Sequence, residues 1–191
     1  LNIWDVKTFK RKDGSQGRVS NLQIGDDTGK IKVTLWDDKA DFVKEIGYDD
    51  TVEIINGFAR TNNYNQEVEI QLGNHGLIKK TNTTVNYKEN FTPINEIDAS
   101  SKKPCSVDGA VSGIGDIKEF TRKDGSINTV ANIYLSDDTG RIRIALWGEK
   151  ANLIDQLDID TKIQIIDAYS KPGFQDDVEL SVGNKSRVVI L

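Results

Sequence analysis

The sequence predicts an all-β protein that contains two small closed barrels in tandem. The first observation is an internal repeat: residues 9–40 and 120–151 align without a gap at an offset of 111, with 17 identical pairs in 32 positions. The second is a period-two alternation of apolar and polar residues, which is typical of half-buried strands. The third is the set of elements, because five short strands and one short helix in about 100 residues favour a closed barrel over an open sheet.

Each copy is expected to contain three strands, a short helix and two further strands. The second and third strands are joined by Asp-Asp-Thr-Gly at 26–29 and again at 137–140. This is a tight turn in which glycine adopts a backbone conformation that other residues resist. In the third strand Ile31, Val33 and Leu35 share one face, which the alternation assigns to the core.

A short helix is predicted after the third strand, over 37–46 in the first copy and 149–157 in the second. The last strand repeats as well, because EVEIQLGN at 67–74 matches DVELSVGN at 177–184 at an offset of 110. The second copy therefore has one residue fewer in an intervening loop, as expected of a surface connection.

The repeat predicts a first domain at 1–78, a polar linker at 79–90 and a second domain at 91–191. Residues 103–112 of the second copy have a counterpart that would precede Leu1, so the first copy is expected to lack the start of its first strand. The chain contains no Met, and we therefore expect it to be a piece of a longer polypeptide.

Composition excludes several classes of protein. The single Cys105 allows no disulfide framework and no Cys-rich zinc site within this chain, and one histidine, His75, allows no multi-His metal site. No cofactor is expected. No apolar run approaches the roughly 18–20 residues that span a bilayer, and the N-terminus lacks a signal-peptide pattern. We therefore expect a soluble, cytoplasmic protein with no membrane partner.

The net charge of −5 argues at first against a nucleic-acid partner, but the charges are unevenly placed. From Lys7 to Lys32, seven basic and three acidic residues give +4, whereas from Asp37 to Glu53 two lysines and seven acidic residues give −5. In the second copy, Lys118 to Arg143 holds five basic and four acidic residues, which gives +1. The acidic excess of the first copy is therefore concentrated around its predicted helix.

The third strand ends in a tryptophan on its polar face in both copies. Trp36 shares that face with Lys32, and Trp147 shares it with Arg143, opposite the residues assigned to the core. An outward indole beside cations suits stacking on nucleic-acid bases, with the cations at the phosphates. The alternative is that these tryptophans cap the barrel end or pack on the short helix. Their repetition beside basic residues favours binding.

Two loops add further candidates. Tyr64 and Phe174 occupy matching polar, turn-rich loops between the last two strands, where they either reach a ligand or fold back onto the barrel. The first hairpin presents basic residues beside an Asp-Gly turn, for which solubilising charge is the alternative interpretation. These basic residues are Arg11, Lys12, Arg122 and Lys123.

The second strand also has a polar outward face. By alternation it presents Asn21 and Asn132, together with Gln23 and Tyr134. These side chains either hydrogen-bond base edges or only meet water.

The sequence does not predict an enzyme. Residues 27–29 and 138–140 mimic the paired Asp-Thr-Gly motifs of two-lobed aspartic proteases. Those motifs normally follow an apolar strand and lead into Ser or Ala, whereas here each follows an Asp and leads into Lys or Arg in a solvated hairpin. The sequence also shows no Ser–His–Asp set and no phosphate-cradling glycine loop.

The string DDTG-[KR]-I-[KR], followed by Leu-Trp and a short helix, resembles the oligonucleotide/oligosaccharide-binding (OB) domains of the replication protein A family. It is most similar to archaeal single-stranded-DNA-binding proteins and to the tandem DNA-binding domains of the eukaryotic large subunit. Residues 92–97, Thr-Pro-Ile-Asn-Glu-Ile, also look like that family's approach to a second such domain. The resemblance covers nearly the whole chain, twice, although the zinc module of many relatives is missing here.

This resemblance implies two OB folds, each a five-stranded Greek-key barrel with a short helix between strands three and four and a groove for single-stranded DNA. It implies base stacking by Trp36 with Tyr64 in the first barrel and by Trp147 with Phe174 in the second. It also implies backbone contacts by basic residues of the first hairpin, the third strand and the approach to the loop between strands four and five. These are Arg11, Lys12, Lys32, Arg60, Arg122, Lys123, Arg143 and Lys171.

The sequence thus predicts a protein that binds single-stranded DNA with little sequence preference and protects it in replication, repair and recombination. Its expected partners are single-stranded DNA and further OB domains or subunits of the same replication protein, and its expected location is with the nucleoid. One alternative is an RNA-binding OB module, which the sequence does not separate from a DNA-binding one. Another is a protein-interaction OB domain, which need not keep stacking aromatics in both copies.

Overall fold

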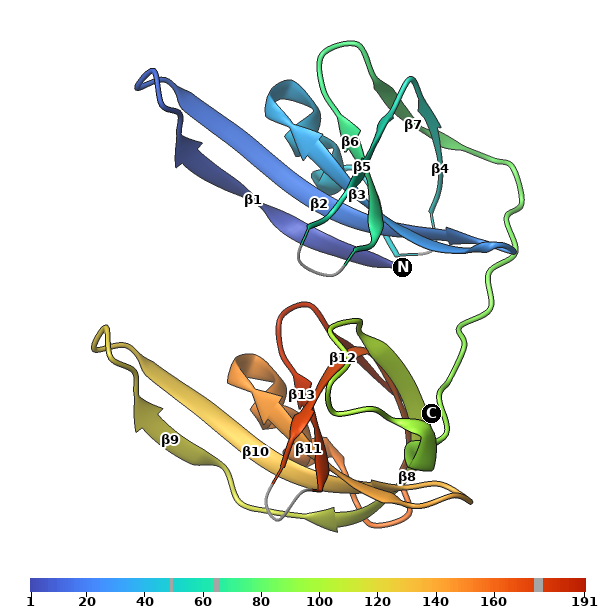
Figure 1. The fold of residues 1–191 in the computed structure, drawn as a ribbon, viewed down its shortest axis with the longest axis vertical. Helices are drawn as coiled ribbons and strands as arrows, with labels where there is room; N and C mark the ends of the chain where they lie inside the picture. Colours follow the sequence, from blue (N-terminus) through green and yellow to red (C-terminus); the bar gives the residue numbers. More distant parts are fainter. Residues whose placement is uncertain (49, 64–65, 174–176) are drawn as a thin grey trace. The chain divides into compact units, whose positions relative to one another are not determined.

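The computed structural model describes residues 1–48, 50–63, 66–173 and 177–191. The chain divides into two compact units, Leu1–Lys88 and Glu89–Leu191, which we call the first and second unit. Each unit is built almost entirely from strands, as the alternation predicts (Figure 1). The all-β class is therefore confirmed. The boundary between the units falls within the predicted linker, 79–90.

The described part of the first unit forms two sheets. One has the strand order β1-β2-β3-β6-β5, in which β3 and β6 run parallel and the other neighbours are antiparallel, and the second pairs β4 with β7. The elements are β1 (Asn2–Lys10), β2 (Gln16–Asp26), β3 (Gly29–Trp36), η1 (Asp37–Lys44), β4 (Thr51–Ile55), β5 (Phe58–Thr61), β6 (Val68–Leu72) and β7 (Leu77–Thr81).

The described part of the second unit forms one continuous sheet, in the order β11-β13-β12-β8-β10-β9. Strand β10 also pairs with β11, which closes the barrel, and β14 pairs with β12. The elements are η2 (Ile94–Glu96), β8 (Cys105–Ile114), β9 (Lys118–Thr121), β10 (Ile127–Ser136), β11 (Arg141–Trp147), η3 (Gly148–Gln156), β12 (Lys162–Pro172), β13 (Val178–Val182) and β14 (Arg187–Ile190).

Each unit has its own apolar core, formed by the strand faces that the alternation assigned to it. In the first unit Val33 and Leu35 of β3 pack with Leu72 of β6, and all three side chains are fully buried. In the second unit Ile144 and Leu146 of β11 occupy the matching positions. Ile31 is only half-buried, whereas Ile142 at the matching position of the second unit is buried.

The structure adds detail to two parts of the sequence-based expectation. The predicted short helix follows β3 and β11 as expected, but η1 and η3 both have 3₁₀ rather than α geometry. The described part of each unit also has seven strands rather than five. One expected strand is divided in two, into β4 and β5 or into β8 and β9, and a last strand, β7 or β14, is added and pairs with β4 or β12. The strand β7 extends to Thr81, so regular structure reaches into the first residues of the predicted linker.

Candidate nucleic-acid interface

The outward face of β10 and β11 in the second unit forms the floor of a groove of about 500 Å³. Register places Asn132 of β10 directly opposite Ala145 of β11, and Val130 opposite Trp147. Four residues singled out in the sequence line this one groove, namely Asn132, Arg143, Trp147 and Lys171. The structure therefore brings together side chains that lie up to 39 positions apart in the chain (171 − 132).

The Trp147 ring is fixed from two sides. The Phe120 ring of β9 meets it edge-on, with the ring centroids 5.7 Å apart and an interplanar angle of 85°. The Lys171 ammonium lies 5.5 Å from the centroid of the Trp147 ring, which is the geometry of a cation–π contact. Trp147 is only half-buried, so it remains accessible from the groove.

A buried carboxylate lies beneath the cations of the second unit. The Glu179 carboxylate accepts Arg143 Nη1 at 3.1 Å and Lys171 Nζ at 2.8 Å, and its side chain is 9% exposed. Because a buried charge needs partners, Glu179 fixes the positions of both basic side chains. Arg143 and Lys171 therefore reach a phosphate only in competition with Glu179.

The first unit repeats this arrangement around Trp36. The Phe9 ring meets the Trp36 ring edge-on, with centroids 5.8 Å apart and an interplanar angle of 78°. The indole Nε1 of Trp36 donates a hydrogen bond to Gln71 Oε1 at 2.8 Å. Trp36 is half-buried, as Trp147 is.

The first unit also has a carboxylate beneath its cations. Glu69 of β6 accepts Lys32 Nζ at 3.3 Å and the Asn62 amide at 2.9 Å. Arg60 of β5 is exposed and lies directly opposite Glu69 in the sheet register. Asn21 is engaged within the protein, because its Oδ1 accepts the Thr34 hydroxyl at 2.9 Å.

The tips of the first hairpins are shaped by their Asp-Gly turns. The Asp13 carboxylate accepts the hydroxyl and the N–H of Ser15, and these hydrogen bonds hold the pKa of Asp13 below its usual value. Asp124 and Ser126 repeat both hydrogen bonds and the lowered pKa. Lys12 lies on this first turn and is exposed to solvent.

Arg11 does not project freely from its hairpin. Its Nη2 lies 2.5 and 2.6 Å from the two oxygens of Asp37, and its Nη1 donates to the Gln16 carbonyl at 2.8 Å. The N–H of Arg18 and the Arg11 guanidinium hold the pKa of Asp37 below its usual value. In the second unit Gly148 occupies the position of Asp37, and the matching Arg122 is exposed, as is Lys123.

Tyr64 and Phe174 lie outside the described residues, so the predicted loop aromatics stay predictions. Two features of the interface were not predicted from the sequence, and both occur in each unit. One is the carboxylate that pairs with the cations, Glu69 or Glu179, and the other is the phenylalanine that packs on the tryptophan, Phe9 or Phe120. The repeat contained the signal for both, because each pair occupies matching positions in the two copies.

Other kinds of site were also considered. Among residues 1–48, 50–63, 66–173 and 177–191, no three His, Cys, Asp or Glu side chains gather as metal ligands. No helix of that described part is long and apolar enough to cross a membrane.

Comparison with known proteins identifies the family. No protein-family model matches the chain. Replication factor A of Methanothermobacter thermautotrophicus is 31% identical to it over 203 aligned residues, which cover 98% of this chain and 24% of that protein. The chain is homologous to the replication protein A family. It spans about a quarter of the length of this archaeal relative.

A plant relative supports the same assignment. A replication protein A 70 kDa DNA-binding subunit of Arabidopsis thaliana is 30% identical over 161 residues, which cover 77% of this chain and 20% of that protein. Among solved structures, a replication protein A heterotrimer bound to single-stranded DNA superposes with a TM-score of 0.63 at 20% identity. The match covers 99% of this replication protein A homologue and 46% of that chain, and it confirms the tandem OB fold.

Proposed function

We propose that this chain binds single-stranded DNA with little sequence preference. The observation that supports the proposal is a pair of half-buried tryptophans on the outward faces of the barrels. Trp36 is the last residue of β3, and Trp147 is the last residue of β11. Stacking on an aromatic ring tolerates any base, because every base has a π-face, and contributes about 1–3 kcal/mol per base.

The geometry around each tryptophan suits this role. The phenylalanine packs nearly perpendicular to each tryptophan ring and restricts its rotation, so little side-chain entropy is lost when a base stacks. At Trp147 the base takes the place of the Lys171 ammonium or stacks on the other side of the ring. Phosphates then meet the exposed hairpin cations first. Lys32 and Arg143 already pair with a carboxylate in the groove and contribute less net charge.

Two barrels on one chain strengthen the binding that each provides alone. Once one barrel holds the strand, the second binds it at a high effective concentration. The relatives are named for replication, and we extend the proposal to protection of single-stranded DNA during replication, repair and recombination, together with further OB domains or subunits. The protein would then act at the DNA of the nucleoid, as a binding protein rather than an enzyme.

The double variant Trp36→Ala with Trp147→Ala tests this proposal. We expect it to bind a fluorescently labelled single-stranded oligonucleotide at least tenfold more weakly in an anisotropy titration, because two stacked bases are lost. The matched control is Trp36→Phe with Trp147→Phe, which keeps a ring at both positions and should retain most of the affinity. Circular dichroism checks that both variants fold.

Competition experiments separate the alternatives. Duplex DNA should compete weakly, because its bases are already stacked and paired. Equal or tighter binding of a matched RNA strand would favour an RNA-binding module. Unchanged affinity in the alanine double variant would contradict the stacking assignment, and a lack of binding to any nucleic acid would favour a protein-interaction domain.

A further inference from the structure

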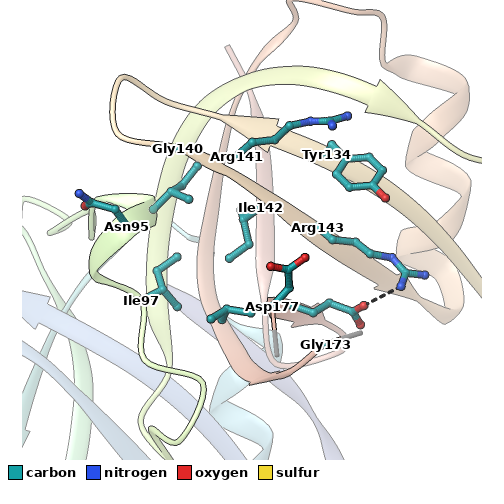
Figure 2. A pocket seen from close by; sticks show the side chains of 12 residues that line it. Asn95, Ile97, Tyr134, Gly140, Arg141, Ile142, Arg143, Gly173 and Asp177 are labelled. Carbon is teal, nitrogen blue, oxygen red and sulfur yellow. Dashed lines mark ion pairs between the residues drawn. The ribbon is translucent and has the colours of Figure 1, made fainter. Parts of the chain in front are cut away.

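A second cavity lies beside the groove of the second unit. It has a volume of about 610 Å³, within the range of roughly 300–1,000 Å³ that is typical of small-molecule sites. It shares Arg143, Gly173 and Glu179 with the groove that contains Trp147, so the two are adjacent. The cavity extends along β10 and β11 towards the turn that joins them, and Figure 2 shows the side chains around it.

An aromatic ring and a guanidinium form one side of this cavity. The guanidinium carbon of Arg141 lies 4.0 Å from the centroid of the Tyr134 ring, and Tyr134 is 37% exposed. Arg141 is held by Ser112, whose hydroxyl accepts its Nε at 3.2 Å. Both groups are flat, and flat cationic and aromatic surfaces are the ones on which bases stack.

The fold leaves room for this pair. Gly113 is the residue opposite Tyr134 in the sheet. A Cβ atom at Gly113 would lie 2.9 Å from Arg141 Nη2 and 3.0 Å from Tyr134 Cδ2, so the guanidinium and the ring would both have to shift to accept it. The absence of a side chain at Gly113 therefore lets the ring and the guanidinium lie together on the sheet.

The opposite side of the cavity is apolar. Ile94 and Ile97 contribute to it from η2 and the residue after it, and both are buried. The segment is held in place by the β10–β11 turn, because Ile94 N–H donates to Asp137 Oδ2 at 2.9 Å and Asn95 N–H donates to Thr139 Oγ1 at 3.2 Å. An apolar wall across from a flat cationic surface suits a planar ligand.

The first unit lacks these features at the matching positions. At the offset of 111, Gln23 replaces Tyr134, Lys30 replaces Arg141 and Asn2 replaces Gly113. At these matching positions the first barrel therefore has neither an aromatic residue nor an arginine, and a side chain stands where the second barrel has Gly113. This part of its β2 is instead covered by the Tyr87 ring, which packs on Gly25 opposite Lys30. The two barrels are expected to differ in the number of bases they hold.

We propose that this cavity is a subsite for one further nucleotide of single-stranded DNA, present in the second barrel and absent from the first. The Arg141 guanidinium already covers one face of the Tyr134 ring, and the base continues this stack. Its phosphate lies on the side of Arg141, away from the Asp177 and Glu179 carboxylates that also line the cavity. This subsite rests on the proposed function, because the groove that contains Trp147 must hold the neighbouring nucleotides.

Abasic scanning tests the proposal with the full chain. In the shortest oligonucleotide that binds at full affinity, each base is replaced in turn by an abasic residue, and the loss of affinity marks the stacked positions. We expect Tyr134→Ala to weaken binding of the intact oligonucleotide by roughly five- to a hundredfold, the loss of one stacked base. In the Tyr134→Ala variant, removing the base at one particular position should cause no further loss of affinity, because the ring on which that base stacks is already absent. This comparison is a double-mutant cycle.

Further variants separate a stacking role from a structural one. Tyr134→Phe keeps the ring and should retain both the affinity and the abasic pattern, whereas Tyr134→Leu keeps apolar bulk and should lose both. Gln23→Ala changes the matching position of the first barrel and should leave the pattern unchanged.

The outcome separates this subsite from the broader function. The proposed subsite is contradicted if Tyr134→Leu has the same affinity and the same abasic pattern as the unmodified chain while Trp147→Ala weakens binding. If Trp147→Ala and Tyr134→Leu both leave the affinity unchanged, the proposed function of the groove fails together with the subsite.

Discussion

The two tryptophans differ in the hydrogen bonding of the indole N–H, and a single neighbouring side chain accounts for the difference. Gln71 accepts the indole N–H of Trp36, but Ser181 stands at the matching position of the second unit. There the indole Nε1 of Trp147 is buried and has no hydrogen-bond partner among the described residues. A buried donor without a partner costs about 1–3 kcal/mol, so the second barrel holds its tryptophan less favourably.

Ser181→Gln should supply the missing acceptor. We expect the substitution to raise the free energy of unfolding by about 0.5–1.5 kcal/mol, the net value of one hydrogen bond. Urea unfolding of the full chain measures the change, and Gln71→Ser is the matched control, which should lower stability by a similar amount. An unchanged midpoint in Ser181→Gln would show that the buried indole N–H already has a partner, such as an ordered water.

At the scale of elements, the two long hairpins differ in how they are held. The Arg11–Asp37 ion pair joins the β1–β2 turn to the end of β3, directly beside Trp36. Asp37 adopts a left-handed backbone conformation with φ of 55°, and Gly148 has φ of 60° in the second unit. Gly148 adopts that conformation without strain but has no carboxylate, so the Arg122 hairpin lacks this connection.

This difference predicts unequal protection of the two hairpins from amide hydrogen exchange. Residues 11–16 should be better protected than 122–127 in the unmodified chain, because the ion pair holds their turn. Asp37→Gly keeps the backbone conformation and removes the carboxylate, so it should reduce protection at 11–16 to the level of 122–127. Equal protection before and after the substitution would mean that the ion pair does not restrain the hairpin.

The same ion pair predicts a pH dependence with a definite sign. Hydrogen bonds from Arg18 and Arg11 lower the pKa of Asp37 in the folded state. The stabilisation is therefore fully present above about pH 3.9, the ordinary value for Asp, and is lost as the pH falls through the lower folded-state pKa. Protection factors at 11–16 should stay constant from neutral pH down to that range and fall below it. Asp37→Gly should remove the part of this fall that is due to Asp37, and the part due to Asp13, which accepts the Ser15 N–H in the same turn, should remain.

At the scale of the whole molecule, the sequence repeat was sufficient to predict two barrels and the outward position of both tryptophans. Alternation alone assigns Ile144 to the core and Trp147 to the opposite face, and in the structure Ile144 is fully buried and Trp147 lines the outward groove. Lys32 and Glu69 were not paired in advance, because they lie 37 positions apart and meet only through the parallel pairing of β3 with β6. Which residue pairs with a charged side chain depends on the neighbouring strand in the sheet, and the pattern within its own strand does not predict it.

The placement of charge also predicts how binding responds to salt. Affinity for a single strand falls with the logarithm of salt concentration, with a slope of about 0.7 per phosphate contact. Lys12→Gln with Lys123→Gln removes two exposed hairpin cations and should reduce the slope by about 1.4 in anisotropy titrations. Lys32→Gln should change it less, because Lys32 gives up its ion pair with Glu69 to reach a phosphate.

The control for this experiment lies on the acidic side of the first barrel. Lys44 belongs to η1 and pairs with Asp41 at 2.7 Å, so Lys44→Gln changes the net charge by the same amount as one hairpin substitution. If binding depends on cations of the interface rather than on the net charge of −5, Lys44→Gln should leave the slope unchanged. A slope that responds equally to Lys44→Gln and Lys12→Gln would contradict the assignment of the backbone contacts to the hairpins.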